Sequence, residues 1–240
     1  MALFAGTSGW AYATWKPGFY PDKLPQKRFL EHYATRLNSV EVNYTFRALP
    51  TETQLAGWME AAGPDFRFSF KAPEIITHRK RLKECGDSVD RFLTALTPVR
   101  NAGRLGALLF QLPPNFKADV ARLEDFLSLP QMAHAGRVCF EFRNVSWSDE
   151  ATWSVLRRFN AAVCVAESED LKTPEVQTAK DFACYRLRMA GGYDDVTIAD
   201  QAAKFHALAA ERDVFVYYKH EDDPAGPLAA EAMRLQAAEL

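Results

Sequence analysis

The stretch Arg137-Val-Cys-Phe-Glu-Phe-Arg-Asn-Val-Ser-Trp147 alternates between two kinds of side chain. Successive side chains of a β-strand point to opposite faces, so the apolar residues at positions 138, 140 and 142 share one face. The opposite face carries Glu141 and Arg143. Charged side chains on a strand with such an apolar face require a ligand, a partner charge or water. The stretch therefore predicts a buried strand, and the rest of the chain must decide which of these its polar face meets.

The same alternation recurs along the chain and is interleaved with segments of helical periodicity. Strands are expected at residues 3–8, 39–43, 66–71, 106–112, 138–143, 162–167, 182–188 and 214–220. Helices are expected at residues 26–36, 52–62, 88–100, 119–129, 197–212 and 226–239, with one more ending at Phe159 and capped by Ser146 or Ser148. Residues 168–181 are expected to be irregular, with one short helix.

Eight strands that alternate with helices in one unbroken series predict a (β/α)8 TIM-type barrel, formed by residues 1–240 as a single domain. The length agrees, because such barrels typically have about 250 residues. The alternative is an open doubly wound sheet, which should carry a glycine-rich phosphate loop after its first strand. The segment Gly6-Thr-Ser-Gly-Trp10 is too short for that loop.

The composition is that of a soluble globular protein, with 48% hydrophobic and 25% charged residues. The net charge of -2 provides no general attraction to nucleic acid or to an acidic membrane. There is no signal-peptide pattern and no apolar run of the roughly 18 residues that a membrane span needs. A cytoplasmic location without a membrane partner is expected. The cysteines Cys85, Cys139, Cys164 and Cys184 lack CxxC spacing and are expected to be free thiols.

Polar side chains occupy one face of several expected strands, and in a barrel this face points into the lumen. The expected inward set is Glu41, Asn43, Arg67, Ser69, Lys71, Glu141, Arg143, Arg186 and Arg188, joined at strand ends by Gln111, Glu167, Tyr217 and Lys219. Its six cations outnumber its three carboxylates, which predicts a net-positive pocket for an anionic small molecule bearing phosphate or carboxylate. The alternative is that these charges only pair within the barrel, for example Arg67 with Glu41 and Glu141 with Arg186.

Chemical roles follow from the residue types in this set. Glu141 and Glu41 could divide general-acid and general-base work, or each could simply orient a neighbouring arginine. Lys71 could act as an electrophilic or Schiff-base lysine or simply contact an anion. His78 follows the third expected strand and is the fourth catalytic candidate. The expected ligand contacts are Asn43, Gln111, Arg143, Arg186, Arg188, Lys219, Tyr217 and Trp10. No metal and no other cofactor is expected, because His and carboxylate side chains do not cluster densely at the strand ends.

Ordered motifs also connect the chain to a known family. They include Gly6-Thr-Ser-Gly-Trp10, Val40-Glu-Val-Asn-Tyr-Thr-Phe46, Phe70-Lys-Ala-Pro73, Ile76-Thr-His78, Leu109-Phe-Gln-Leu-Pro-Pro114, Phe140-Glu-Phe-Arg143, Tyr185-Arg-Leu-Arg188 and Tyr217-Tyr-Lys-His-Glu221. Over nearly its whole length the chain resembles the YecE-like family, domain of unknown function number seventy-two. The resemblance implies a TIM-type barrel but supplies no reaction. It maps the family's motif residues onto Glu41, Asn43, Lys71, His78, Gln111, Glu141, Arg143 and Arg186.

The chain departs from this family at two places. Arg47-Ala48 stands where members usually carry Tyr-Arg, and Arg188-Met-Ala-Gly191 stands where many carry His-Gly. An aromatic or imidazole role is therefore not expected at these positions.

Three functions remain open. The first is an enzyme, a hydrolase or lyase acting on a small phosphorylated or carboxylated substrate. The second is a non-catalytic barrel that senses or sequesters an anionic metabolite or nucleotide. The third is a nucleic-acid-processing factor, which is less favoured because no basic helix stripe or known nucleic-acid-binding module accompanies the pocket. The sequence leaves the oligomeric state open.

Overall fold

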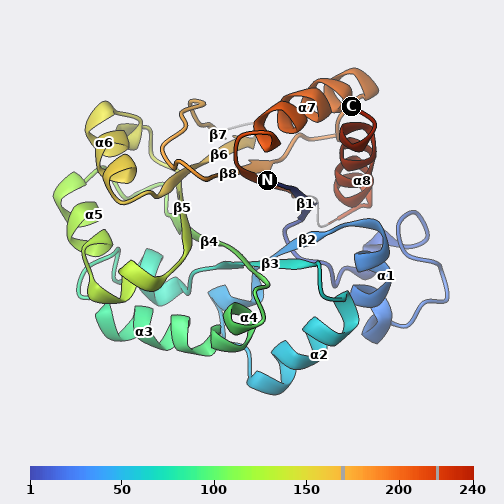
Figure 1. The fold of residues 1–240 in the computed structure, drawn as a ribbon, viewed down its shortest axis with the longest axis horizontal. Coiled ribbons are helices and arrows are strands. Elements are labelled where there is room, and N and C mark those ends of the chain that lie inside the picture. Colours follow the sequence, from blue (N-terminus) through green and yellow to red (C-terminus); the bar gives the residue numbers. More distant parts are fainter. Residues whose placement is uncertain (169–170, 220–221) are drawn as a thin grey trace.

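The computed structural model describes residues 1–168, 171–219 and 222–240, and helices surround a sheet that curls into a nearly closed barrel (Figure 1). The strands are β1 (Leu3–Thr7), β2 (Ser39–Val42), β3 (Arg67–Lys71), β4 (Leu105–Leu112), β5 (Arg137–Phe142), β6 (Ala162–Ser168), β7 (Leu171–Lys172), β8 (Phe182–Leu187) and β9 (Asp213–Tyr218). The helices are α1 (Phe29–Arg36), α2 (Glu52–Ala62), α3 (Gly86–Ala95), α4 (Thr97–Asn101), α5 (Val120–Leu127), α6 (Glu150–Arg158), α7 (Asp195–Ala209) and α8 (Ala225–Ala238). Shorter helical turns are η1 (Ala13–Trp15), η2 (Gln26–Arg28), η3 (Tyr44–Phe46), η4 (Ile75–Arg79), η5 (Pro130–His134) and η6 (Val145–Trp147).

Eight of the strands run parallel in the order β1-β9-β8-β6-β5-β4-β3-β2, and the short β7 pairs antiparallel with β6. This arrangement confirms the predicted TIM-type barrel. All eight expected strands are present within a few residues of their expected bounds. The carboxyl ends of parallel strands meet at one rim, so side chains that follow each strand are brought together there.

The barrel closes between β1 and β2 through a short contact. One parallel bridge joins Ser8 to Glu41, and the Gly9 N–H donates to the Glu41 carbonyl at 2.8 Å. The closure therefore lies at the carboxyl ends of the two strands, next to the Glu41 side chain that faces the lumen.

Below this bridge, side chains replace part of the strand ladder. Asn38 pairs with the backbone of β1 through both ends of its amide, and the Tyr33 hydroxyl accepts from Thr7 N–H and donates to the Ser39 carbonyl. A Cβ atom at Gly6 would lie 1.9 Å from that carbonyl oxygen. Glycine is therefore required here for the close approach of β1 to β2.

The bulky apolar face of β5 packs against the helices, as predicted. Phe140 of β5 stacks on Phe110 of β4 with ring centroids 5.4 Å apart, and it meets Phe126 of α5 edge-on at 6.2 Å. Phe142 stacks on Trp147 at 4.8 Å. Burying one such ring contributes about 1.5–3 kcal/mol. This packing fixes the register of β5, and the alternation of the strand then turns Glu141 into the lumen.

The interior of the barrel below the rim is filled by small and aromatic side chains. Cys139, Cys164 and Cys184 are buried free thiols in this layer. Tyr217 lies among them, and its hydroxyl is 2.7 Å from the hydroxyls of both Ser39 and Ser69. Cys139, Cys184 and Tyr217 lie two residues before Glu141, Arg186 and Lys219, so the layer forms a floor beneath the charged side chains of those strands.

Three local expectations were wrong. The helix expected at residues 88–100 is divided into α3 and α4, because Pro98 lacks an N–H for a continuous helix. Helix α6 is capped by Asp149, whose carboxylate accepts from Ala151 N–H at 2.8 Å, and not by Ser146 or Ser148. Within residues 168 and 171–181 the structure has the short strand β7 and no helix.

Among the residues that the structure describes, none of the helices combines the length and the apolar character needed to cross a membrane.

Candidate active site at the barrel mouth

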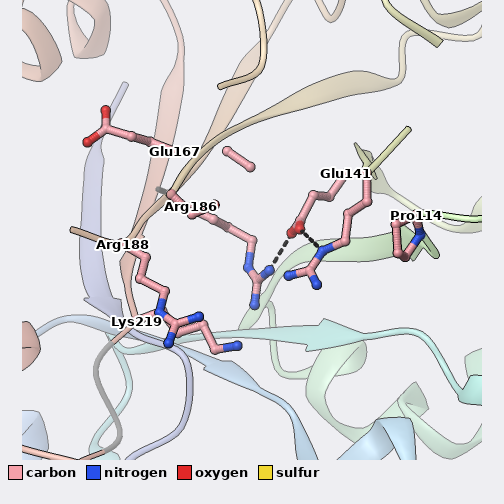
Figure 2. A pocket seen from close by; sticks show the side chains of 9 residues that line it. Pro114, Glu141, Glu167, Arg186, Arg188 and Lys219 are labelled. Carbon is pink, nitrogen blue, oxygen red and sulfur yellow. Dashed lines mark hydrogen bonds and ion pairs between the residues drawn. The ribbon is translucent and has the colours of Figure 1, made fainter. Parts of the chain in front are cut away.

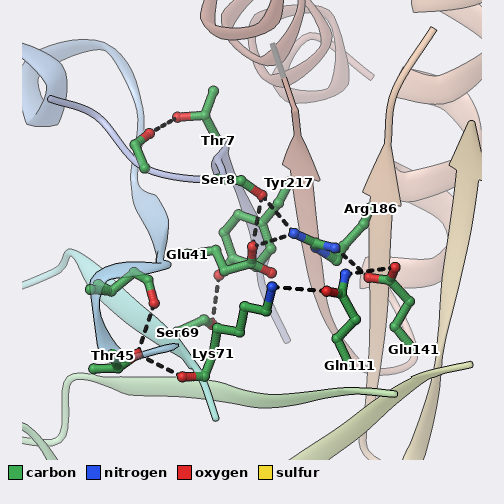
Figure 3. Close-up of polar contacts among 12 residues, drawn as sticks. Thr7, Ser8, Glu41, Thr45, Ser69, Lys71, Gln111, Glu141, Arg186 and Tyr217 are labelled. Atoms are coloured by element: carbon green, nitrogen blue, oxygen red, sulfur yellow. Dashed lines mark hydrogen bonds and ion pairs between the residues drawn. The ribbon is translucent and has the colours of Figure 1, made fainter. Parts of the chain in front are cut away.

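Five of the predicted site residues come together at the carboxyl ends of five strands (Figure 3). They are Glu41 of β2, Lys71 of β3, Gln111 of β4, Glu141 of β5 and Arg186 of β8. Hydrogen bonds and ion pairs connect all five into one network. Positions far apart in the sequence meet here because parallel strands end at the same rim of the barrel.

Arg186 lies at the centre of this network. Its Nη2 donates to Glu41 Oε1 at 2.9 Å and to Ser8 Oγ at 3.2 Å, and its Nη1 forms an ion pair with Glu141 Oε2. Both carboxylate side chains are only 1% exposed. The guanidinium therefore compensates two buried charges at once, which makes their burial tolerable.

Of the two ion pairs that the alternative interpretation expected within the barrel, one is present and one is not. Glu141 does pair with Arg186, but Glu41 also pairs with Arg186 and not with Arg67. The Arg67 guanidinium lies at the opposite end of its strand, where it donates to the Asp65 carbonyl at 3.0 Å. Arg67 begins β3, so alternation alone assigned it to the lumen but could not place it at the right depth.

Glu141 is held as a carboxylate by its partners. Its Oε1 accepts from Gln111 Nε2 at 2.8 Å and from Arg143 Nε at 2.9 Å. Burial alone would raise the pKa of Glu141, but the charges of Arg186 and Arg143 outweigh this and lower the pKa to about 2. A carboxylate with this pKa stays ionised at neutral pH and is a weak base.

Lys71 has the opposite electrostatic situation. Its Nζ donates to Gln111 Oε1 at 2.8 Å and lies 4.3 Å from the centroid of the Phe46 ring. Burial, followed by the charge of Arg186, lowers the pKa of Lys71 to about 8 even though Glu41 and Glu141 oppose the shift. A substantial part of this amine is therefore neutral just above physiological pH.

His78 packs on the same aromatic ring as Lys71. It lies in the π-helical turn η4, its Nδ1 is 2.9 Å from Thr77 Oγ1, and its ring meets Phe46 edge-on at 5.0 Å. Burial and the nearby Lys71 charge lower the pKa of His78, so the imidazole is neutral at pH 7.

A pocket of about 340 Å³ opens beside the network (Figure 2). Its wall carries the cations Arg143, Arg186, Arg188 and Lys219 and the carboxylates Glu141 and Glu167. The remaining lining residues are Pro114, Ala166 and Ser168. Among the described residues that line the pocket, four cations against two carboxylates make the wall net positive, in agreement with the sequence prediction for the C-terminal mouth.

Four of the eight predicted ligand contacts lie outside the lining of this pocket, namely Gln111 of the network and three further residues. Tyr217 belongs to the floor, where Ser39 and Ser69 engage its hydroxyl. Trp10 packs edge-on against Trp58 with ring centroids 5.3 Å apart. Asn43 precedes η3 next to the network, and its Oδ1 is buried without a hydrogen-bond partner among the described residues.

Sequence reasoning assigned no role to two residues that touch the network. Ser8 donates to Glu41 Oε1 at 2.7 Å, and Phe46 lies beneath both Lys71 and His78. Ser8 directly follows β1, so its place at a strand end was the signal that could have identified it. The position of Phe46 depends on the turn η3 that folds it back over β3, and no periodicity predicts that turn.

Within residues 1–168, 171–219 and 222–240, no group of three or more His, Cys, Asp or Glu side chains is placed to hold a metal ion.

A parallel barrel with a charged carboxyl-terminal mouth defines a TIM-barrel protein. A family model described as "Protein of unknown function DUF72" matches residues 4–239. The chain therefore belongs to the DUF72 family, which confirms the resemblance of its motifs to the YecE-like family.

Two relatives named as UPF0759 proteins match parts of this chain. UPF0759 protein YecE of Escherichia coli (strain K12) is 44% identical over 87 residues, which are 36% of this chain and 31% of YecE. UPF0759 protein YunF of Bacillus subtilis (strain 168) is 28% identical over 152 residues, which are 60% of this chain and 52% of YunF. The matched regions thus span about a third and about half of these relatives.

Solved structures show the same fold. A DUF72 family protein from Thermotoga maritima superposes with a TM-score of 0.83 at 22% identity, and the match covers 100% of both chains. An AP endonuclease, family 2, from Brucella melitensis superposes with a TM-score of 0.55 at 13% identity and covers 98% of both chains. At these identities the likeness concerns the fold alone.

Proposed function

We propose that this protein is an enzyme, a hydrolase or lyase, that acts on a small phosphorylated or carboxylated substrate at the barrel mouth. The observation that carries the proposal is the net-positive wall of the pocket, where the described lining residues include four cations and two carboxylates at the carboxyl ends of the strands. Active sites of TIM-barrel enzymes lie at this end.

The anion would be bound by the cations of the pocket wall that are not fully buried. Arg143 gives one nitrogen to Glu141 but remains 39% exposed, and Arg188 and Lys219 also line the pocket. Guanidinium groups bind phosphate and carboxylate through paired, charge-assisted hydrogen bonds. Arg186, in contrast, is committed to Glu41 and Glu141, so it supports the wall mainly through its charge.

The reactive group in this proposal is Lys71. Its lowered pKa of about 8 lets it gain or lose a proton near neutral pH, which an effective acid–base group or nucleophile must do. Glu141, with a pKa of about 2 and three hydrogen-bonding neighbours, serves instead to position Arg186, Arg143 and Gln111. His78 provides a neutral imidazole on the same Phe46 ring.

The fold-level neighbour named AP endonuclease, family 2, fits a hydrolase, because both chains form the same kind of barrel over nearly their whole length. This likeness supports the class of architecture. It does not extend to a nucleic-acid substrate, since the net charge of this chain is -2 and its cations gather in a pocket of about 340 Å³.

A second candidate is a non-catalytic barrel that binds an anionic metabolite or nucleotide. This candidate is favoured by the hydrogen bonds that occupy the Glu141 carboxylate and by the two ion pairs of Arg186, because groups held in this way act as a rigid scaffold. A binding barrel would be stabilised by its ligand without forming product. The enzyme would consume the same ligand, and Lys71→Gln would abolish that consumption while ligand binding persists.

The test is a thermal-shift screen with inorganic phosphate, citrate and small phosphorylated or carboxylated metabolites on the wild-type chain, Arg143→Ala and Arg157→Ala. A ligand at 100 times its Kd should stabilise by about 2.7 kcal/mol, or about 5–10 °C for a chain of this size. Arg157 is the matched control, since its side chain is 43% exposed, pairs with Glu150 and lies in α6. Hits that survive Arg143→Ala as well as they survive Arg157→Ala would refute the proposed anion site.

A further inference from the structure

The amine of Lys71 is held in one position by polar and aromatic contacts. Its Nζ donates to Gln111 Oε1 at 2.8 Å, and the Gln111 amide is itself fixed by donating to Glu141 Oε1 at 2.8 Å. The Phe46 ring covers another side of the amine at 4.3 Å. A lysine held in this way loses little conformational freedom when it reacts, which is an advantage for a nucleophile.

Glu141 connects this amine to the anion pocket. The same carboxylate lines the pocket, binds Arg143 at 2.9 Å and, through Gln111, holds Lys71. Lys71 does not itself line this pocket but lies one side chain further, at Gln111, so a ligand whose anionic group contacts Arg143 must extend past Gln111 to reach the amine. Figures 2 and 3 show Glu141 and Arg186 in both settings.

Charged and titratable groups from several elements face Lys71. They are Glu41 of β2, Glu141 of β5, Arg186 of β8, Lys219 after β9 and His78 of η4. Burial and the two cations favour the neutral amine, and the two carboxylates oppose them; the result is a pKa of about 8. At pH 8 about half of the amine is then neutral, compared with less than about 1% for an ordinary lysine.

We propose that Lys71 attacks a carbonyl carbon of the substrate and forms a Schiff base, so that the substrate carries both a carbonyl and an anionic group. This inference rests on the proposed function, because the anion is bound by the pocket described above. The substrate class is a keto acid or a phosphorylated aldehyde or ketone.

The step balances without a further reactant. The lone pair of the neutral Lys71 amine forms the N–C bond, the C=O π bond breaks, and a proton passes from nitrogen to the oxygen to give a carbinolamine. The carbinolamine then loses its hydroxyl group and a proton as water to form the imine. His78, neutral and packed on the same Phe46 ring, is the nearby group that can relay a proton. Hydrolysis of the imine returns the free amine.

The test is reductive trapping on the wild-type protein. Dihydroxyacetone phosphate, its uncharged counterpart dihydroxyacetone, and pyruvate are each added with sodium cyanoborohydride, and adducts are located by peptide mass spectrometry. We expect Lys71 to be labelled at least tenfold faster than the exposed Lys23, and faster by the phosphorylated ketone than by the uncharged one. Arg143→Ala should remove that preference, and Arg157→Ala should retain it.

The pH dependence gives a second measurement that needs no Lys71 variant. Trapping at Lys71 should rise with pH and level off above about pH 8, because only the neutral amine attacks. Labelling of Lys23 should continue to rise toward the ordinary lysine pKa of about 10.4. Labelling spread evenly over surface lysines, or absent with all three probes, would overturn the Schiff-base proposal. If anions still stabilise the protein in an Arg143-dependent manner, the proposed function survives that result; if they do not, both proposals fail.

Discussion

Two sets of cations occupy the barrel mouth, and they differ in how far their charges are already compensated. Arg186 is buried between Glu41 and Glu141 and forms ion pairs with both carboxylates. Arg143 is 39% exposed with a single carboxylate partner, and Arg188 is exposed with no carboxylate at ion-pair distance among the described residues. The comparison teaches that burial divides the cations of the mouth: the buried one compensates the carboxylates of the barrel, and the exposed ones are those that we propose bind the anion.

The largest expected effect comes from removing the central cation. Arg186→Met should destabilise the protein by about 3–5 kcal/mol in urea unfolding, because Glu41 and Glu141 would be left buried without their partner. Arg158→Met is the control, since Arg158 pairs with Glu124 on an exposed surface and should change the free energy of unfolding by less than about 1 kcal/mol. Equal effects from the two substitutions would contradict a structural role for Arg186.

The next largest expected effect is the decrease in the free energy of unfolding at acid pH. The pKa of Glu141 is lowered to about 2 in the folded protein, so its contribution is present above its unfolded pKa and is lost as the pH falls toward 2. The difference from the ordinary value of 4.5 corresponds to about 3 kcal/mol. Glu141→Gln should therefore flatten the decrease in the free energy of unfolding between about pH 5 and pH 2. Identical pH profiles for the variant and the wild type would show that Glu141 is not held ionised by Arg186 and Arg143.

A smaller effect in the same direction, with stability rising as the pH rises, is expected from Lys71 at alkaline pH. The pKa of Lys71 is lowered from 10.5 to about 8 in the folded protein, so the unfolded chain binds the extra proton between about pH 8 and pH 10.5. The contribution of Lys71 to the free energy of unfolding should therefore rise with pH in this window, by about 1–2 kcal/mol after allowance for the partial exposure of the side chain. The buried cysteines have raised pKa values and act in the opposite direction, so the Lys71 contribution is measured as the difference between wild type and Lys71→Met in urea unfolding at pH 7.5 and pH 10. An equal change with pH in the two proteins would contradict the lowered pKa of Lys71.

The alternation of side chains was sufficient to predict much of this arrangement. Phe140 and Phe142 could be assigned to the helix-facing layer because their bulk requires burial, and this placed Glu141 in the lumen. The same reasoning brought Glu41, Lys71, Gln111 and Arg186 to one rim, since parallel strands share their carboxyl end. Side-chain alternation and the parallel order of the strands each involve whole strands, so both can be predicted from the sequence.

Depth and contact partners could not be predicted in the same way. Arg67 has the alternation of a lumen residue but begins its strand, so its guanidinium contacts the Asp65 carbonyl at the opposite end of the barrel. Tyr217 was expected to contact ligand, yet its hydroxyl lies between Ser39 and Ser69. Whether one cation serves Glu41 or Glu141 or both depends on the stagger between strands, which alternation does not encode.

Arg188→Ala should have the smallest effect on stability, and it tests most directly whether the exposed cations bind the anion while the buried one stabilises the barrel. Isothermal titration with inorganic phosphate should be carried out on wild type, Arg188→Ala and Arg157→Ala, together with urea unfolding of each. Arg188→Ala removes one charge-assisted contact, so the Kd for phosphate should increase about tenfold or more. The free energy of unfolding of this variant should stay within about 0.5 kcal/mol of wild type. Arg157→Ala should change neither quantity. Phosphate binding that is unaffected by Arg188→Ala, or a loss of stability comparable to that of Arg186→Met, would contradict the division between barrel-building and ligand-binding cations.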